Sequence, residues 1–120
     1  MIKHIAFFAY PVSNIEKSRK FYEEILGLRL SLNFQDQWIE YDIAGGTLAI
    51  TTMVKDLKPG AAGAFIGLEV DNIDAEVARL KKKGAIFKVE TFDTPGCRIA
   101  VMADPDDNGI NLHQMKPGRS

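Results

Sequence analysis

A short stretch of this sequence occurs twice. Val12-Ser13-Asn14-Ile15-Glu16 returns as Val70-Asp71-Asn72-Ile73-Asp74, 58 residues later (position 70 against position 12). Each copy follows a strand-like apolar run and leads into a segment whose apolar residues have helical spacing. A five-residue match can arise by chance, but both copies stand at the same point in the same order of elements. We therefore interpret the chain as an internal duplication.

The first half predicts a strand, a helix and three further strands. The first strand is expected at residues 4–10 and is ended by Pro11. Ser13 and Glu16 have the Ser-x-x-Glu spacing of a helix capping box, and Gly27 marks the helix end. The remaining strands are expected at residues 28–34, 37–43 and 47–53, with Ala44-Gly45-Gly46 as a hairpin turn.

The second half repeats this order. Strands are expected at residues 64–70, 86–91, 97–103 and 110–115. Between the first two, a helix is expected with Asp71 as N-cap, lysines 81–83 in its last turn and Gly84 after it. Turn-forming residues 104–109 precede the last strand, and residues 116–120 form a predicted frayed tail.

The two halves predict a single α+β domain built of two β-α-β-β-β modules. The modules cover about residues 1–53 and 64–115, and the polar, glycine-containing segment 54–63 is the predicted linker. The linker permits the modules to pair within one chain or between two chains. The four strands of each module are expected to form a curved mixed sheet.

Charge and cysteine content exclude several classes of partner. Lysine and arginine number 15 and aspartate and glutamate 16, so a nucleic acid or an anionic membrane is not the expected main partner. No apolar run approaches the roughly 20 residues that span a bilayer. The start of the chain does not resemble a secretory signal. Cys97 is the only cysteine and cannot form an internal disulfide, so a cytoplasmic location is expected.

Several short motifs lie in a specific order along the chain. A histidine stands at the head of the first strand, Phe21-Tyr22 precedes Leu26-Gly27-Leu28, and Asp104-Pro105-Asp106 with Asn108 precedes the last strand. Together with the paired modules, they resemble the vicinal oxygen chelate superfamily. That superfamily includes glyoxalases, bleomycin- and fosfomycin-resistance proteins and extradiol dioxygenases. The resemblance implies that the sheets curl into a cup that holds a ligand, and that the protein is a homodimer.

The resemblance also implies where metal ligands would lie. Metal-dependent members use a His or Gln in the first strand, a His in the fifth and a Glu in the last, and glyoxalases often add a Glu in the fourth. Imidazole and carboxylate suit divalent metals that polarise substrate oxygens. In this sequence the positions fall on His4, Phe65 and Asn111, and on or near Ala49. Only His4 remains as a candidate metal ligand, so no metal cofactor is expected.

Strand alternation combined with the resemblance predicts which side chains face the cup. The predicted ligand-binding residues are His4, Trp38, Glu40, Phe65, Cys97, Val101, Asn111 and His113. Glu69 has the same strand parity as Phe65 and could pair with Glu40 as acid and base. Alternatives stay open: His4 as a strand-end histidine or a proton-transfer group, Trp38 on an ordinary solvated face, and Cys97 as a buried, unreactive thiol.

Three functions are compatible with these residues. The first is a metal-independent protein that binds a small apolar or aromatic molecule. The second is a glyoxalase-like lyase or isomerase, with a rebuilt divalent-metal site or a histidine as general base. The third is a protein whose dimer interface or partner contact is its function. The fold alone does not choose between them, because pocket lining decides the chemistry.

Overall fold

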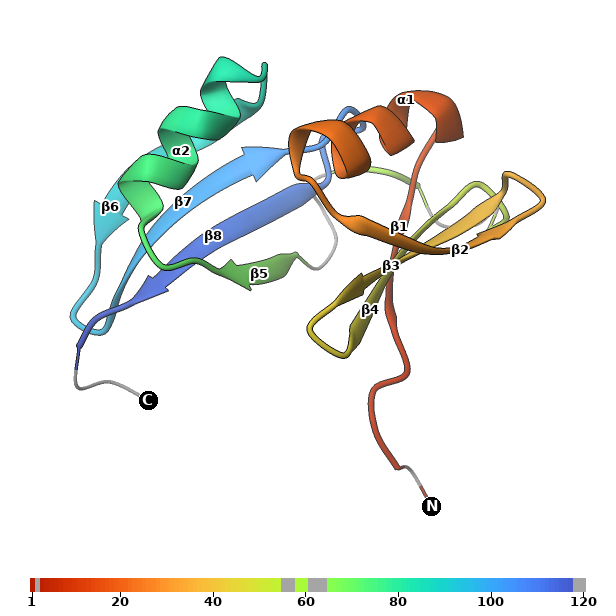
Figure 1. Ribbon diagram of the computed structural model, residues 1–120, viewed down its shortest axis with the longest axis horizontal. Coiled ribbons are helices and arrows are strands. Elements are labelled where there is room, and N and C mark those ends of the chain that lie inside the picture. The colour runs from red at the N-terminus through yellow and green to blue at the C-terminus, as the bar shows by residue number, and fades with distance from the viewer. Residues whose placement is uncertain (2, 55–57, 61–64, 118–120) are drawn as a thin grey trace. The chain divides into compact units, whose positions relative to one another are not determined.

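The computed structural model describes residues 1, 3–54, 58–60 and 65–117 (Figure 1). Contacts divide the chain into two units, Met1–Pro59 and Gly60–Ser120. The boundary falls within the predicted linker 54–63, of which residues 55–57 and 61–63 lie outside the described residues. Each unit is a four-stranded mixed sheet with one helical segment, so the predicted α+β fold is confirmed.

Unit 1 contains four strands and one helical segment, which begins as an α-helix and continues as a π-helix. Its elements are β1 (Phe8–Pro11), α1 (Ile15–Arg19), the π-helical η1 (Lys20–Ile25), β2 (Arg29–Phe34), β3 (Trp38–Ile43) and β4 (Gly46–Thr51). The strand order is β1-β4-β3-β2, with β1 parallel to β4 and the other pairs antiparallel. Ala44 and Gly45 have positive φ in the turn between β3 and β4, as the sequence predicted.

The core of unit 1 lies between its helix and one face of its sheet. Four side chains of β3 and β4 are fully buried there: Ile39, Tyr41, Leu48 and Ile50. Tyr22 of η1 stacks on Tyr41, with 5.9 Å between the ring centroids and 24° between the planes. Burying each large aliphatic side chain stabilises the fold by about 2 kcal/mol. The helix therefore covers one face of the sheet and leaves the alternate residues on the other.

Unit 2 repeats this architecture. Its elements are β5 (Ile66–Glu69), α2 (Ile73–Lys82), β6 (Ile86–Asp93), β7 (Cys97–Ala103) and β8 (Gly109–Met115), in the sheet order β5-β8-β7-β6. Again the first strand is parallel to its neighbour and the others are antiparallel. Figure 1 shows α2 lying along one face of this sheet. The buried side chains Ile73 and Leu80 of α2 lie on that side, with Leu112 of β8 among the core residues.

Both predicted helix caps are wrong by one residue. Asn14, not Ser13, caps α1: its Oδ1 accepts from the Lys17 backbone N–H at 2.9 Å. Asn72, not Asp71, caps α2 by accepting from the Ala75 N–H at 3.1 Å. Both asparagines have extended backbone, which is the conformation that lets a short polar side chain reach the first free N–H groups of a helix.

Several strand boundaries differ from the prediction. β1 begins at Phe8, not His4, and includes Pro11, which an edge strand tolerates because its N–H is not needed in the ladder. β4 ends at Thr51, β5 begins at Ile66, and β6 extends to Asp93 through two register irregularities against β7. β7 has the predicted bounds. Residue 64 lies outside the described residues.

The ends of β8 are well anchored. Asp104 Oδ1 accepts from the backbone N–H groups of Asp106 and Asn108, each at 2.9 Å, which closes the predicted turn before the strand. After the strand, Lys116 donates from Nζ to the Thr94 carbonyl at 2.7 Å and from its backbone N–H to Gly96. The predicted frayed tail is therefore wrong at Lys116, and residues 118–120 lie outside the described residues. None of the described helices has the length and hydropathy of a membrane-spanning segment.

Candidate functional site

The sheet of unit 2 has one face without a helix. Arg98 and Gln114 mark the other face, because Arg98 donates to Asp74 of α2 at 2.9 Å and Gln114 accepts from the Ile73 N–H at 2.8 Å. Residues that alternate with these two in the strands point the opposite way. The helix-free face of sheet 2 carries Phe65, Glu69, Val89, Phe92, Cys97, Ile99, Val101, Asn111, His113 and Met115. The face thus includes every site residue that the sequence predicted in this half of the chain.

Most of this face is apolar and exposed. Phe65 is 63% exposed, Phe92 45% and Val89 42%. Ile99 and Val101 lie between them on β7 and are half-buried. Several exposed aromatic and aliphatic side chains on one face are typical of a surface that contacts a ligand or a partner. The predicted wall residues Phe65 and Val101 belong to this group.

One polar pair interrupts the apolar face. Glu69 of β5 and His113 of β8 are register partners, and Glu69 Oε1 lies 2.5 Å from His113 Nδ1. Glu69 Oε2 accepts from the Met115 backbone N–H at 2.8 Å. The Met115 N–H first, and then His113, hold the pKa of Glu69 below its ordinary value. Both oxygens of this half-exposed carboxylate are therefore engaged, which fixes its orientation.

The sequence did not predict this pair. From strand parity alone, the sequence analysis paired Glu69 with Glu40 and placed His113 on the same face as Asn111. Glu69 and His113 lie 44 positions apart. The parallel pairing of β5 with β8 sets their register, and no local sequence signal fixes a register between distant strands.

Cys97 is half-buried on the same face, so the interpretation of a buried thiol is wrong in that respect. Its Sγ lies 3.0 Å from Thr94 Oγ1, and its backbone N–H donates to the same oxygen at 3.0 Å. The turn before β7 thereby holds the thiol at the start of the strand. Arg98 points to the opposite face, toward Asp74 and Asp93, and is not a neighbour that would activate the thiol.

Unit 1 has a helix-free face of the same kind. Trp38 and Glu40 alternate with the buried Ile39 and Tyr41, so they lie opposite α1 and η1, as predicted. Trp38 Nε1 donates to Glu40 Oε2 at 2.8 Å, and the Phe7 ring packs edge-on against Trp38 at 5.2 Å between centroids. Leu32 and Phe34 of β2, each 46% exposed, are register partners of Glu40 and Trp38. Each unit thus presents an apolar face with one carboxylate oriented by a ring nitrogen.

The internal repeat changes which residue matches the first-strand metal-ligand position of metal-dependent relatives. β1 and β5 begin at Phe8 and Ile66, again 58 residues apart (66 against 8). Phe7 is therefore the counterpart of Phe65, and His4 lies three positions earlier, outside β1 and exposed. The first-strand ligand position of metal-dependent relatives falls on Phe7 rather than on His4. Contact of His4 with a ligand stays a prediction.

The residues at these positions do not fit a divalent metal site within either unit. Phe7, Phe65 and Ala49 have no donor atom, and the amide of Asn111 is neutral and gives little charge compensation. Across the described ranges of the chain, no group of three or more His, Cys, Asp or Glu side chains is placed to hold a metal ion.

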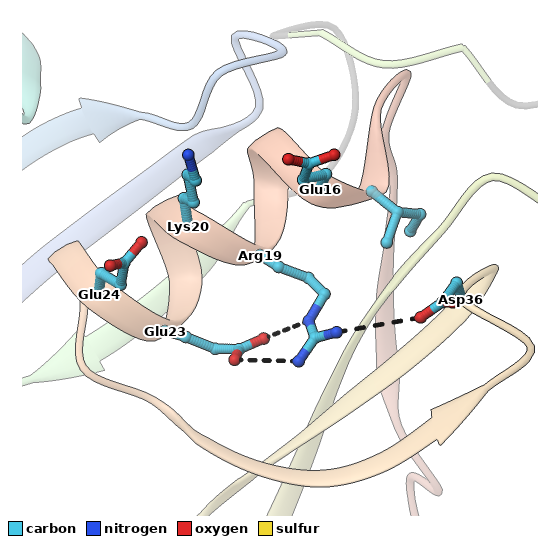
Figure 2. Close-up of a pocket in the computed structure, with 7 residues that line it drawn as sticks. Glu16, Arg19, Lys20, Glu23, Glu24 and Asp36 are labelled. Atoms are coloured by element: carbon cyan, nitrogen blue, oxygen red, sulfur yellow. Dashed lines mark hydrogen bonds and ion pairs between the residues drawn. The ribbon is translucent and has the colours of Figure 1, made fainter.

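A hollow of about 470 Å³ lies beside α1 and the turn between β2 and β3 (Figure 2). Figure 2 shows Glu23 and Asp36 extending toward the Arg19 guanidinium, with Arg19 Nε 2.7 Å from Glu23 Oε2. Tyr41 donates its hydroxyl to the same carboxylate at 2.9 Å. Arg19 first, and then Tyr41, lower the pKa of Glu23, while burial and Glu23 raise the pKa of Tyr41.

These contacts give the hollow a structural role. The Glu23 carboxylate is shared by Arg19 on the helix and Tyr41 on β3, so it ties η1 to the sheet. Most residues that line the hollow are charged, and Arg19 pairs there with Glu23 and Asp36. A small organic ligand is usually held on a more apolar surface. The helix-free faces are the better candidates for the functional site.

Comparison with known proteins agrees with this geometry. The sequence profile of the glyoxalase/bleomycin resistance protein/dioxygenase superfamily matches residues 2–112. The chain belongs to this superfamily. The family resemblance inferred from the sequence motifs is thus confirmed.

Two proteins of known structure are similar over almost the whole chain. TnmS3, an antibiotic binding protein from Streptomyces sp. CB03234, is 31% identical, with a TM-score of 0.82 over 96% of this chain and 98% of TnmS3. A superfamily member from Sphaerobacter thermophilus is 25% identical, with a TM-score of 0.80 over 94% of this chain and 98% of that protein. A probable lactoylglutathione lyase from Vibrio cholerae is 29% identical over an alignment of 118 positions that covers 88% of this chain and 86% of the lyase.

Proposed function

We propose that this superfamily member binds a small, partly aromatic molecule against its helix-free faces. The observation that carries the proposal is the composition of those faces. Each combines exposed aromatic and aliphatic side chains with one oriented carboxylate, Glu40 in unit 1 and Glu69 in unit 2. Ligand sites are mostly apolar with a few placed polar groups that give direction, and these faces have that composition.

The similarity to TnmS3 supports this proposal. TnmS3 is described as an antibiotic binding protein, and its similarity covers nearly all of both chains. The identity of its antibiotic does not transfer to this chain, because the lining residues decide which molecule is held. What transfers to the proposal is the class of function: recognition of a small organic molecule by this fold.

The proposed binding does not use the divalent metal of metal-dependent relatives. Phe7 and Phe65 occupy two of the positions that carry metal-binding residues in those relatives, and Asn111 and Ala49 occupy the others. Replacing an imidazole by a phenyl ring removes a donor and adds apolar surface. The same substitutions that remove the metal site therefore favour an apolar ligand.

A cytoplasmic location is proposed because Cys97 is the only cysteine in the chain. Two copies are proposed to associate, because both units expose large apolar side chains on their helix-free faces. Phe7, Phe34 and Phe65 are each at least 46% exposed. Contiguous apolar surface of this kind favours association. The near-neutral charge balance of the chain gives no support for a nucleic acid or an anionic membrane as partner.

A lyase of the glyoxalase type is the second candidate. The probable lactoylglutathione lyase from Vibrio cholerae favours it, at 29% identity. His113 would then act as the general base, because Glu69 holds its ring through Nδ1 and Nε2 is the nitrogen that could accept a proton. An isomerisation assay with the hemithioacetal of methylglyoxal and glutathione, with and without added divalent metal, tests this candidate. Turnover above the protein-free rate would favour the lyase over the binding protein.

The proposed function is tested by equilibrium dialysis with para-nitroanisole, a neutral aromatic probe. We expect saturable binding to the unmodified protein. Phe65→Glu places a charge on the helix-free face of sheet 2 and should weaken binding at least tenfold, which is about 1.4 kcal/mol. Ala78→Glu introduces the same charge on the exposed surface of α2 and should leave affinity within about twofold. Absence of saturable binding, or equal effects of the two variants, would contradict the proposal.

A further inference from the structure

Glu69 and His113 form a two-residue unit on the helix-free face of sheet 2. The carboxylate is held at both ends, by His113 Nδ1 and by the Met115 backbone N–H. The two residues are direct partners of the parallel β5–β8 pair, so the backbone fixes their spacing. The arrangement does not depend on a flexible loop, because both residues lie within strands.

The contact decides which nitrogen of His113 carries the proton. An ionised carboxylate accepts hydrogen bonds and cannot donate, so the proton of neutral His113 lies on Nδ1, between the two residues. Nε2 of the neutral ring then carries a lone pair and is an acceptor. Within the described part of the chain, no hydrogen bond engages Nε2, and the His113 side chain is 32% exposed. The pair thus presents a basic nitrogen to whatever lies against this face.

Few charged side chains other than Glu69 lie near His113 on the helix-free face of sheet 2. From β7, the partner of His113 is the apolar Ile99, and the thiol of Cys97 is held by Thr94. From β6, Phe92 and Val89 face the same side. Other charged residues of the sheet are engaged elsewhere: Arg98 with Asp74, Lys88 with Asp107, and Glu90 with Lys81. Glu69 is the charged group in contact with His113.

We infer that the Glu69–His113 pair receives the hydroxyl of a phenol or enol and accepts its proton. This inference rests on the proposed binding of an aromatic molecule and names its chemical class. The ligand O–H bond breaks as an N–H bond forms at Nε2, and the electron pair stays on the ligand oxygen. Glu69 stabilises the imidazolium that results, because opposite charges in contact favour the charged form. Asn111, on the same face of β8, offers an amide donor for a second ligand oxygen.

Other ligand classes fit this position less well. A carboxylic acid is already ionised near neutral pH and has no proton left to transfer to Nε2. An aliphatic alcohol is too weak an acid to give up its proton to an imidazole. A phenol combines an acidic hydroxyl with a flat apolar body, and Phe65, Phe92 and Val101 supply apolar surface for that body.

The test uses para-nitrophenol, whose phenolate absorbs in the visible range while the neutral phenol does not. At a pH where the free probe is mostly protonated, we expect the bound probe to show the phenolate spectrum. His113→Gln keeps a polar side chain but removes the base, and should abolish that spectrum and weaken binding of the phenol about tenfold. Glu69→Gln should reduce the phenolate signal, because the imidazolium loses its counter-charge.

Two controls separate this inference from the function on which it rests. Glu90→Gln makes the same change as Glu69→Gln on the same sheet, at a residue paired with Lys81 of α2, and should leave the spectrum unchanged. Para-nitroanisole lacks the acidic proton, so its affinity should fall less than that of para-nitrophenol in His113→Gln, and it should bind Glu90→Gln within about twofold of the unmodified protein. If the anisole binds but the bound phenol stays neutral, or His113→Gln keeps the phenolate spectrum, the inference is overturned and the proposed function stands. If neither probe binds, both are overturned.

Discussion

Asn14 and Asn72 make the same contact in the two units. Each accepts, through its side-chain oxygen, the backbone N–H three residues further along, that of Lys17 or of Ala75. Each has an extended backbone at the start of the helix that follows the first strand of its unit. The sequence repeat is therefore also a structural repeat, and it aligns the two units from the first strand to the start of the helix.

Asn72→Ala is predicted to destabilise the protein by about 1 kcal/mol, since it leaves an N–H of α2 without its cap. Asp71→Ala should cost less than half of that, although the capping pattern in the sequence pointed to Asp71. Urea denaturation followed by circular dichroism measures both. Equal losses from the two variants would show that Asn72 is not the cap.

Asn14→Ala should cost a similar amount, and the double variant Asn14→Ala/Asn72→Ala should lose the sum of the two. Changes at separate sites without shared partners add within a few tenths of a kcal/mol. The two caps lie in different units. A double variant that loses much less than the sum would indicate that the caps share partners.

Glu23→Gln is predicted to weaken the dependence of stability on acidic pH. The pKa of Glu23 is lowered in the folded protein, mainly by Arg19. A carboxyl with a lowered pKa stabilises the fold above its unfolded pKa, and this contribution disappears as the pH falls through its folded pKa. The unmodified protein should therefore exceed Glu23→Gln in stability at neutral pH, and the difference should shrink on acidification.

The control for this experiment is Glu24→Gln, at the exposed neighbouring residue. It should leave the pH dependence close to that of the unmodified protein. Tyr41→Phe removes the hydroxyl that donates to Glu23 and should cost about 1 kcal/mol at neutral pH. If the stability difference between the unmodified protein and Glu23→Gln grew toward low pH, the sign would be opposite to the prediction. The ion pair with Arg19 would then not be the cause of that difference.

Ligand binding is predicted to slow chemical labelling of Cys97. The thiol is half-buried on the helix-free face of sheet 2, and it is the only cysteine in the chain. Its reaction with iodoacetamide, followed by mass spectrometry, should slow several-fold at saturating para-nitroanisole. In Phe65→Glu, the same probe concentration should give little protection. Equal labelling with and without bound probe would place the ligand away from this face.

The sequence predicted the fold and the face of each sheet for physical reasons. Alternation along β3, β7 and β8 has a strict period of two, so the buried Ile39 and Leu112 determined where Trp38 and His113 point. The order of elements followed from apolar periodicity and turn residues. Both signals are local, and local signals are what a single sequence expresses most directly.

The features that the sequence did not predict depend on long-range contacts. The Glu69–His113 pair follows from the register of parallel strands, and the Glu23–Tyr41 contact from the π-helical turn that carries Glu23. The start of β1 at Phe8 was missed because residues 4–7 are as strand-like in pattern as those that pair with β4. The match of the first metal-ligand position to His4 depended on that boundary.

The most direct test of the account is binding of para-nitroanisole before and after removal of divalent metal with a chelator, with metal content measured on the same samples. We predict saturable binding with the same affinity in both samples and no stoichiometric metal in either. Loss of binding on chelation, with recovery on adding back one divalent metal, would contradict the metal-free site. It would mean that other side chains of the protein complete a metal centre.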